Sequence, residues 1–229
     1  MNTKLVIFDM DGTVLDTLSD LLSAMNFSLG KHGYPAHTLN EMKTFVGSGL
    51  YMMAVRALPE GTDKRVIDAV FADFKAQYAS HLNIETAPYP GIVSMMETLR
   101  EHGIKMGISS NKFQEGASLL SDCHFGSLIG CTVGESLRYP KKPDPSGTNA
   151  IVSFFGAKKE NTLYIGDSDV DILTAQNASL PMICVSWGFR PKEELLKAGA
   201  KTIADTPEEL TSAILAHFES LTVDAAREK

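Results

Sequence analysis

The sequence predicts an α/β protein whose parallel sheet is interrupted, after its first strand, by a helical insertion. Short apolar runs alternate with helical patterns over residues 89–229, as in parallel strands joined by covering helices. A lone apolar run at 4–9 precedes them, and the stretch between, about 17–88, has helical spacing without a convincing strand. We therefore expect a core formed by residues 1–16 and 89–229 and a helical domain formed by residues 17–88.

The first strand and the insertion differ in the spacing of their apolar residues. KLVIFD (4–9) is a short, β-rich apolar run that predicts a buried strand. Over residues 18–29, apolar side chains recur at helical spacing. Further helical stretches follow at residues 39–46, 50–58 and 64–82. We expect breaks at GSG (47–49) and PEG (59–61), because glycine and proline interrupt helices.

Beyond PYPG (88–91) the pattern alternates between the two kinds of element. Strands are expected at residues 104–110, 127–133, 161–167, 181–187 and 202–204. Helices are expected at residues 92–102, 114–122, 146–156, 170–178, 192–198 and 207–219. Together with the first strand, these strands would form one parallel sheet that is covered by helices on both faces.

Composition limits the classes of partner. The 229 residues suit one large domain or a domain with an insertion. A formal net charge of −7 argues against nucleic acid, since phosphate backbones need clustered Lys and Arg. No apolar run approaches membrane-spanning length, and the cysteines lack CxxC spacing and indicate reduced thiols. We expect a soluble cytoplasmic protein without a nucleic-acid or membrane partner, as a monomer or a weak homodimer.

Acids, a small hydroxyl, lysines and glycines gather at the ends of the predicted strands. The groups are Asp9 with Asp11, SSNK (109–112), KKPDP (141–145) and GDSDVD (166–171). Each alone is typical of a solvated loop, but ligands of open parallel sheets bind beyond the carboxyl ends of the strands, where these loops would meet. Clustered carboxylates repel one another unless a charge offsets them. They therefore favour a hard divalent cation, and Mg²⁺ suits a site of few carboxylates plus a substrate phosphate.

These motifs, in their order and spacing, resemble the haloacid dehalogenase superfamily of phosphohydrolases, most closely its phosphoglycolate phosphatase-like branch. The motifs are DMDGTVLDT (9–17), ISSNK (108–112), KKPDP (141–145) and YIGDSDVDI (164–172). The resemblance covers nearly the whole chain. It implies a Rossmann-like core with an inserted α-helical cap, and a soluble, Mg²⁺-dependent phosphatase.

By this resemblance, Asp9 would be the nucleophile that forms an aspartyl-phosphate. Asp11 would protonate the leaving oxygen and then act as general base on the hydrolytic water. Asp167 would bind Mg²⁺ beside Asp9, with the backbone carbonyl of Asp11 as a further ligand. Asp171 would orient the metal shell or pair with a lysine.

The same resemblance assigns the phosphoryl group to a set of donors. Ser110 would donate a hydrogen bond to the phosphoryl oxygens, together with backbone N–H groups near Gly12 and Asn111. Ser109 is the competing register, but Ser110 matches the family motif better. Lys142 would neutralise phosphate charge and hold the nucleophile, since phosphoryl transfer depends on positioning and charge neutralisation.

The helical insertion would be a cap that excludes water. Its glycine-flanked VGSGL (46–50) would let the backbone at Gly47 and Ser48 approach the substrate. Arg56 would meet a substrate carboxylate, since its fork suits one. A solvated helix arginine is the alternative interpretation of Arg56.

The predicted reaction is hydrolysis of a small phosphorylated metabolite, a phosphate monoester such as 2-phosphoglycolate. An inorganic pyrophosphatase stays open, as do nucleotide and sugar phosphatases. A β-phosphoglucomutase-like enzyme is disfavoured by Gly166-Asp167, where such mutases usually have Glu-Asp, and a dehalogenase or phosphonatase by the acid at Asp11. A catalytically silent binding protein is disfavoured because Asp9 and Asp167 are both present.

Overall fold

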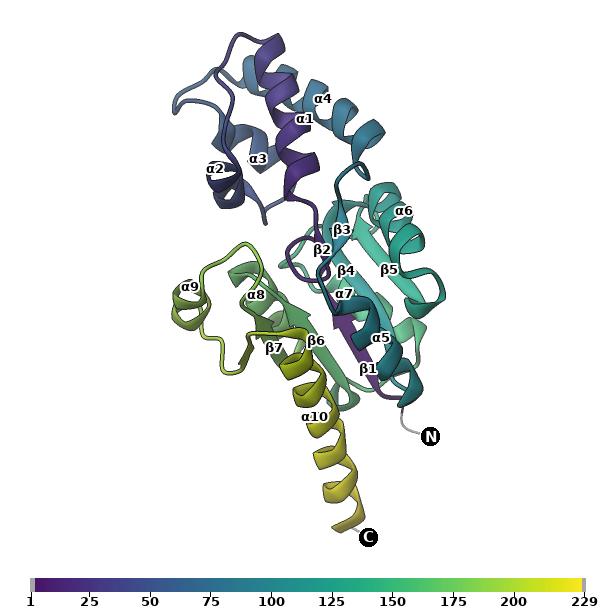
Figure 1. Cartoon of the computed structure of the whole chain (residues 1–229). Helices are drawn as coiled ribbons and strands as arrows, with labels where there is room; N and C mark the ends of the chain where they lie inside the picture. Colours follow the sequence, from purple (N-terminus) through teal and green to yellow (C-terminus); the bar gives the residue numbers. More distant parts are fainter. Residues whose placement is uncertain (1–2, 228–229) are drawn as a thin grey trace.

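The computed structural model describes residues 3–227, with side chains as far as residue 221. A six-stranded sheet in the order β5-β4-β1-β6-β7-β8 forms the core, and all its pairings are parallel (Figure 1). The strands are β1 (Leu5–Phe8), β4 (Lys105–Phe113), β5 (Cys131–Glu135), β6 (Thr162–Gly166), β7 (Met182–Val185) and β8 (Ile203–Ala204). The predicted α/β class and parallel sheet are confirmed.

Helices cover both faces of this sheet. They are α5 (Ile92–Glu101), α6 (Gln114–Phe125), α7 (Ser146–Phe154), α8 (Asp169–Ala178), α9 (Lys192–Lys197) and α10 (Pro207–Arg227), with 3₁₀ turns at Gly126–Leu128 and Lys159–Asn161. Successive side chains of a strand point to opposite faces. Val6 and Phe8 accordingly pack in the cluster with α5, α6 and α10, whereas Leu5 and Ile7 pack in the cluster with α7 and α8. All four side chains are fully buried, which makes β1 the centre of the core.

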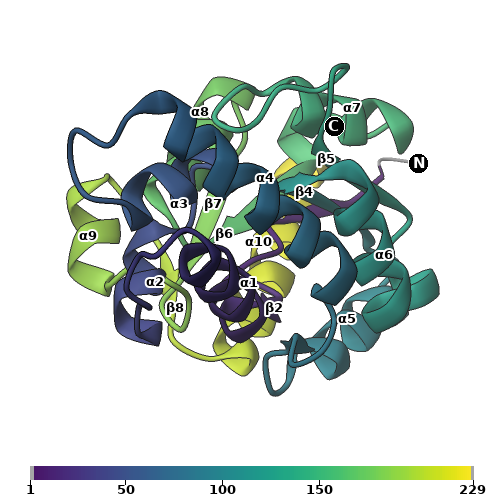
Figure 2. The ribbon, with the colours of Figure 1, turned by 90° about the horizontal axis from the view of Figure 1, so that it is seen from above.

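The insertion folds as four helices that stand apart from the sheet and lie over its strand ends (Figures 1 and 2). They are α1 (Leu18–Lys31), α2 (Leu39–Phe45), α3 (Leu50–Ala57) and α4 (Lys64–His81). Helices α1 and α4 pack along each other through buried apolar side chains such as Met25 and Phe74. The expected inserted helices are thus confirmed, while the domain boundaries at residues 16–17 and 88–89 stay a prediction.

Two short strands join cap and core, and the sequence analysis did not foresee them. Strand β2 (Leu15–Asp16) leads into the cap and pairs antiparallel with β3 (Ala87–Pro88), which leads out of it. Two residues are too few to show an alternating pattern. The predicted strand at 127–133 was also wrong at its start, because a 3₁₀ turn occupies Gly126–Leu128 and β5 begins at Cys131.

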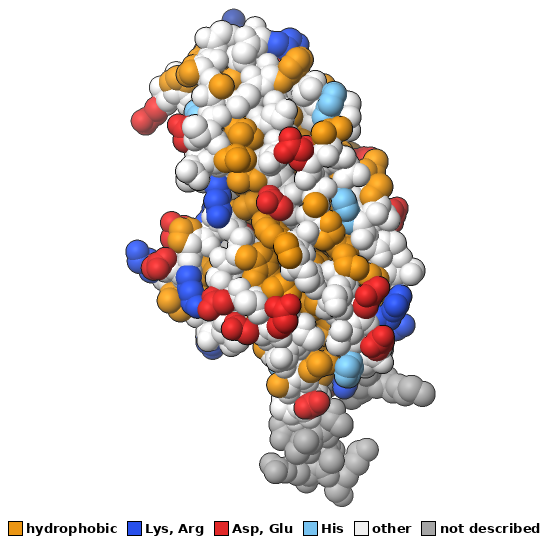
Figure 3. Space-filling model, in the orientation of Figure 1, with side chains coloured by type: hydrophobic (Ala, Val, Ile, Leu, Met, Phe, Trp, Pro, Cys, Tyr) orange, Lys and Arg blue, Asp and Glu red, His pale blue; other side chains and the backbone are white. Residues whose placement is uncertain are grey.

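Two surface properties bear on partners. On the face shown in Figure 3, acidic and basic side chains are interspersed over cap and core, so the described part of this face carries no extended basic surface. None of the helices that the structure describes is long and apolar enough to cross a lipid bilayer.

Candidate active site

A small cavity of about 30 Å³ lies between the carboxyl ends of the central strands and the cap. Its lining is Asp9, Asp11, Leu21, Val46, Gly47, Gly49, Leu50, Met53, Ser110, Asn111, Lys112, Lys142 and Ser168. The polar members come from the core, and the apolar members and glycines come from the cap. Predicted site residues that are far apart in sequence therefore meet in one small cavity, with polar residues of the core on one side and apolar residues of the cap on the other.

Asp9 follows the central strand and is buried. Its backbone N–H donates to the carbonyl of Ile165 at 2.8 Å, which continues the pairing of β1 with β6 past the last strand residue. The next N–H, that of Met10, donates to Oδ1 of Asp9 at 2.7 Å. The backbone thus fixes the Asp9 carboxylate on the core side of the cavity.

Asp9, Asp167 and Asp171 form a buried acidic cluster, with one oxygen of each within 4.8 Å of the others. Burial, with the charge of Asp171, raises the pKa of Asp9 well above its ordinary value. Burial also raises the pKa of Asp167 to about 7, and Asp171 again adds to the shift. One lysine, Lys142, offsets only part of this charge. A buried, under-compensated set of carboxylate oxygens fits a hard divalent cation.

Asp167 is held by donors on both oxygens. The Thr13 hydroxyl donates to Oδ1 at 3.0 Å, and the backbone N–H of Phe189 donates to Oδ2 at 2.7 Å. The approach of this carboxylate to the Asp11 loop depends on Gly12, whose φ is +87°. A Cβ at that position would lie 2.5 Å from Oδ2 of Asp167, so a side chain there would collide with the carboxylate.

Lys142 bridges two of the acids. Its Nζ lies 2.7 Å from Oδ1 of Asp9 and 2.7 Å from Oδ1 of Asp171. Burial alone would lower the pKa of Lys142, but the two carboxylates raise it well above its ordinary value, and the ammonium stays charged. Ser168 donates to Oδ2 of Asp171 from both its backbone N–H and its hydroxyl, at 3.1 and 2.5 Å. Both oxygens of Asp171 are therefore occupied, and it holds Lys142 in place.

Ser110 and Asn111 lie near the carboxyl end of the neighbouring strand β4 and line the same cavity. The Ser109 hydroxyl is instead paired with the Thr148 hydroxyl at 3.0 Å, outside the cavity lining. Asn111 accepts a hydrogen bond from the backbone N–H of Lys142 at 2.6 Å and donates to the carbonyl of Gly47 at 3.0 Å. Asn111 thereby connects the lysine loop of the core with the glycine loop of the cap.

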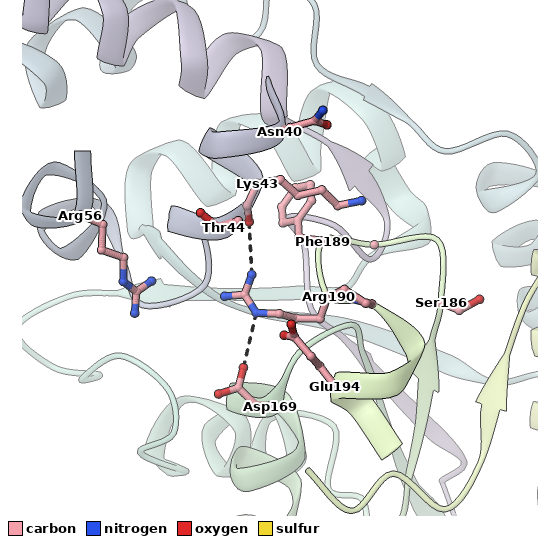
Figure 4. A pocket seen from close by; sticks show the side chains of 11 residues that line it. Asn40, Lys43, Thr44, Arg56, Asp169, Ser186, Phe189, Arg190 and Glu194 are labelled. Carbon is pink, nitrogen blue, oxygen red and sulfur yellow. Dashed lines mark hydrogen bonds and ion pairs between the residues drawn. The ribbon is translucent and has the colours of Figure 1, made fainter. Parts of the chain in front are cut away.

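The structure does not bring Ser48 and Arg56 into this cavity. The guanidinium of Arg56 donates to the Phe45 carbonyl at 2.8 Å and to the Ser48 hydroxyl at 2.9 Å. Arg56 lines a neighbouring, more open pocket of about 730 Å³ between cap and core (Figure 4). Gly47, in contrast, lines the small cavity directly.

The sequence analysis missed Arg190, which follows β7 and reaches up to the cap. Its guanidinium donates to the carbonyls of Lys43 and Val46, at 3.2 and 2.5 Å, and its Nε lies 3.6 Å from the Asp169 carboxylate. Figure 4 shows the contacts with Lys43 and Asp169. No motif surrounds this arginine in the sequence. Lys112 was also given no role, although it belongs to ISSNK, and its partner in the cap is Tyr78.

Comparisons with known proteins agree with this geometry. Residues 6–185 match the family of haloacid dehalogenase-like hydrolases, and the chain belongs to that family. It is 28% identical to a phosphoglycolate phosphatase of Mesorhizobium japonicum over 99% of this chain and 96% of the relative. It is 32% identical to a phosphoglycolate phosphatase of Rhodobacter capsulatus over 81% of this chain and 85% of the relative.

A crystal structure from Lactobacillus delbrueckii subsp. bulgaricus, provisionally named a phosphoglycolate phosphatase, has the same fold. Its TM-score is 0.89 at 36% identity, and the match covers 93% of this chain and 99% of that one. The predicted family and enzyme class, a haloacid dehalogenase-like hydrolase, are confirmed.

Proposed function

We propose that this hydrolase releases phosphate from a small phosphate monoester, 2-phosphoglycolate or a close analogue, through an aspartyl-phosphate on Asp9. One observation carries the proposal: Asp9, Asp11, Ser110 and Lys142 line the same small cavity beside a buried acidic cluster. The names of the relatives, which match over most of their length, support the choice of substrate.

Two carboxylates do the covalent and proton chemistry. An oxygen of Asp9 attacks the phosphorus, and the bond to the ester oxygen breaks. Asp11, which lines the cavity, gives its proton to the departing oxygen. The same carboxylate then takes a proton from the water that attacks the aspartyl-phosphate. Its Oδ1 lies 3.1 Å from the ammonium of Lys112 and has no other polar partner within the described residues.

The transferring phosphoryl group is held by a lysine, a serine hydroxyl and backbone N–H donors. Ser110 and the N–H groups near Gly12 and Asn111 bind its oxygens. Lys142 contacts the nucleophile and neutralises charge that builds on the phosphoryl oxygens. The apolar cap residues that line the cavity exclude bulk water and strengthen these interactions.

Mg²⁺ is the cation that we propose for the acidic cluster, held by Asp9, Asp167 and the backbone carbonyl of Asp11. When bound, it supplies positive charge that draws a phosphoryl oxygen and offsets the carboxylate repulsion. A direct contact of Asp171 with the metal stays a prediction. Its observed hydrogen bonds favour the role of positioning Lys142.

The size of the cavity favours a small ester. The cavity is small, about 30 Å³, so we propose that the cap moves when a substrate enters. A short acid such as glycolate needs less widening than a hexose phosphate, which disfavours the mutase alternative. Arg56 lines the neighbouring, more open pocket and stays the predicted partner of a substrate carboxylate.

Phosphate release from a panel of metabolites, with and without EDTA, tests the proposal. We expect turnover of phosphoglycolate, loss of turnover in EDTA and recovery with Mg²⁺. Rapid turnover of pyrophosphate with none of phosphoglycolate would replace the proposal with a pyrophosphatase. Conversion of a hexose 1-phosphate to the 6-phosphate would replace it with a mutase.

A further inference from the structure

Lys112 is a buried lysine that the roles described above leave unused. Only 1% of its side chain is exposed, although it lines the cavity beside Asp11 and Ser110. A buried ammonium is costly unless it is paired. Its Nζ lies 3.1 Å from Oδ1 of Asp11, and no other cation of the described residues is within ion-pair distance of that acid. The lysine is therefore the specific charged neighbour of the proposed proton donor.

The other partner of Lys112 belongs to the cap. Its ammonium donates to the hydroxyl of Tyr78 and lies 4.6 Å from the centre of the same ring. Tyr78 is in the last turns of α4, the cap helix that ends close to the core (Figure 1). Its ring is fully buried, stacked on Phe74 of the cap at 6.1 Å and edge-on to Phe113 of the core at 6.5 Å.

These contacts form a continuous row from the cap to the proton donor: Tyr78, Lys112 and Asp11. Tyr78 belongs to the cap and Asp11 to the core, and the chain passes between cap and core through β2 and β3. The row is complete only while α4 is seated on the core. If α4 lifted, Lys112 would lose both the hydroxyl and the ring face, and its ion pair with Asp11 would be the one remaining described contact of its ammonium.

We infer that Lys112 is a positioning residue, which Tyr78 of the seated cap holds against Asp11 so that the carboxyl faces the leaving oxygen. The inference rests on the proposed function, because it needs Asp11 as the general acid. It goes beyond the proposed function, because the placement of Asp11 would depend on Tyr78, a cap residue that does not line the cavity.

Dependence on the leaving group separates this role from a structural one. An alkoxide needs a proton to depart, whereas p-nitrophenolate departs without one. The kcat/KM value covers only the steps up to release of the leaving group, so later hydrolysis of the aspartyl-phosphate does not enter it. Misplacing Asp11 should therefore lower kcat/KM for an alkyl phosphate and spare it for p-nitrophenyl phosphate.

The test compares Lys112→Met and Tyr78→Phe with the wild-type protein on both substrates. The alkyl substrate is phosphoglycolate or the alkyl ester that the panel identifies. General acid catalysis contributes about 10²–10⁴-fold, so we expect Lys112→Met to lower kcat/KM for the alkyl ester by about 30-fold or more. We expect a loss of about threefold to tenfold for Tyr78→Phe, which keeps the buried ring. Both substitutions should change kcat/KM for p-nitrophenyl phosphate by less than about threefold.

Tyr51→Phe is the matched control. Tyr51 is also a tyrosine of the cap. Its hydroxyl donates to the Asp68 carboxylate at 3.0 Å, and it does not line the cavity. We expect it to leave the ratio of the two kcat/KM values unchanged. Equal losses on both substrates, or no loss on the alkyl ester, would overturn the inference. If Lys112→Met fails to fold, the ratio for Tyr78→Phe decides. A wild-type protein inactive on every phosphate ester would instead overturn the proposed function.

Discussion

Asp9 and Asp11 are close in the sequence, yet the structure gives them different surroundings. Asp9 accepts a hydrogen bond from the Met10 N–H and faces Lys142 at 2.7 Å. The Oδ1 of Asp11 lies 3.1 Å from the ammonium of Lys112, its one ion-pair partner among the described residues. The two carboxylates therefore differ in the groups that hold them, which fits the different roles that we propose for them.

Replacement of the nucleophile should stop the reaction without unfolding the protein. We expect Asp9→Asn to reduce kcat by about 10⁴-fold or more, because an amide cannot attack the phosphorus. Its similar size should preserve packing, which circular dichroism and a thermal melt would check. The control is Asp205→Asn, an exposed acid that follows β8 at the same sheet edge and is paired with Lys192. Unchanged turnover by Asp9→Asn would remove the nucleophile assignment.

Cation binding should depend on pH because protons compete for the acidic cluster. The pKa of Asp167 is raised from 3.8 to about 7 in the folded protein, chiefly by burial. The folded state thus keeps a proton that the unfolded chain releases, so the metal-free protein loses this stability as the pH rises from 3.8 to about 7. Over the same window, Mg²⁺ should bind about tenfold more tightly per pH unit.

Calorimetric titrations of Mg²⁺ at about pH 5.5, 6.5 and 7.5 would measure this trend. The same titrations on Asp167→Asn should show weak binding with a flatter pH dependence. Equal affinity of the wild-type protein at all three values would contradict the argument that buried protons are displaced.

At the scale of elements, the connection between cap and core is organised by Asp20 of α1. Its buried carboxylate accepts hydrogen bonds from the backbone N–H groups of Ile84, Glu85 and Thr86, at 2.9 to 3.1 Å, and from the Thr86 hydroxyl at 2.7 Å. One side chain at the start of the cap thus holds the segment that leaves it.

Removal of this carboxylate should destabilise the protein substantially. We expect Asp20→Ala to lower the free energy of unfolding by about 2–4 kcal/mol, because it leaves backbone donors without their charged acceptor. Urea denaturation measures the change. Asp68→Ala is the comparison, since this exposed acid pairs with Lys64 on the cap surface, and such pairs contribute about 1 kcal/mol or less. Similar losses in both variants would contradict the special role of Asp20.

The elements themselves could be predicted well, because long apolar patterns report which faces are buried. The cap helices and the alternating core elements all occur. Prediction failed where the pattern was too short, as in β2 and β3, or where contacts cross from one unit to another. Arg190 has no apolar period around it, and Tyr78 resembles any aromatic residue of a helix core. The partners of Arg190 and Tyr78 depend on how the cap is placed on the sheet. The sequence pattern alone does not specify that placement.

The gathering of the candidate site residues was predictable, because they belong to short motifs near the carboxyl ends of parallel strands. Asp9, Asp11, Ser110 and Lys142 meet as expected, since parallel strands end at one edge. Arg56 was placed by motif alone, and its side chain turns to the neighbouring pocket.

At the scale of the whole molecule, core side chains hold the cap shut by donating to its backbone carbonyls. Arg190 donates to Lys43 and Val46, Asn111 donates to Gly47, and Lys141 donates to Ser48 at 3.3 Å. These carbonyls follow one another around the end of α2. A guanidinium at a helix C-terminus also complements the helix dipole.

Loss of the arginine should loosen the cap. We expect Arg190→Met to accelerate amide hydrogen exchange of residues 46–50 by about tenfold, which corresponds to roughly 1.4 kcal/mol of local stability. We also expect a lower kcat/KM for the ester. Lys192→Met is the control, because Lys192 pairs with Asp205 within the core at 2.7 Å and has no cap partner among its described contacts. Exchange that is equally slow in both variants would show that the other donors suffice.

The paired strands β2 and β3 place the entry and the exit of the cap side by side, with Leu15 opposite Pro88 and Asp16 opposite Ala87. The whole cap is thus inserted into the core as one segment whose two ends are paired. The cap can therefore vary in length and sequence between the same two ends, and we expect a different insertion joined there to change which substrates reach the cavity.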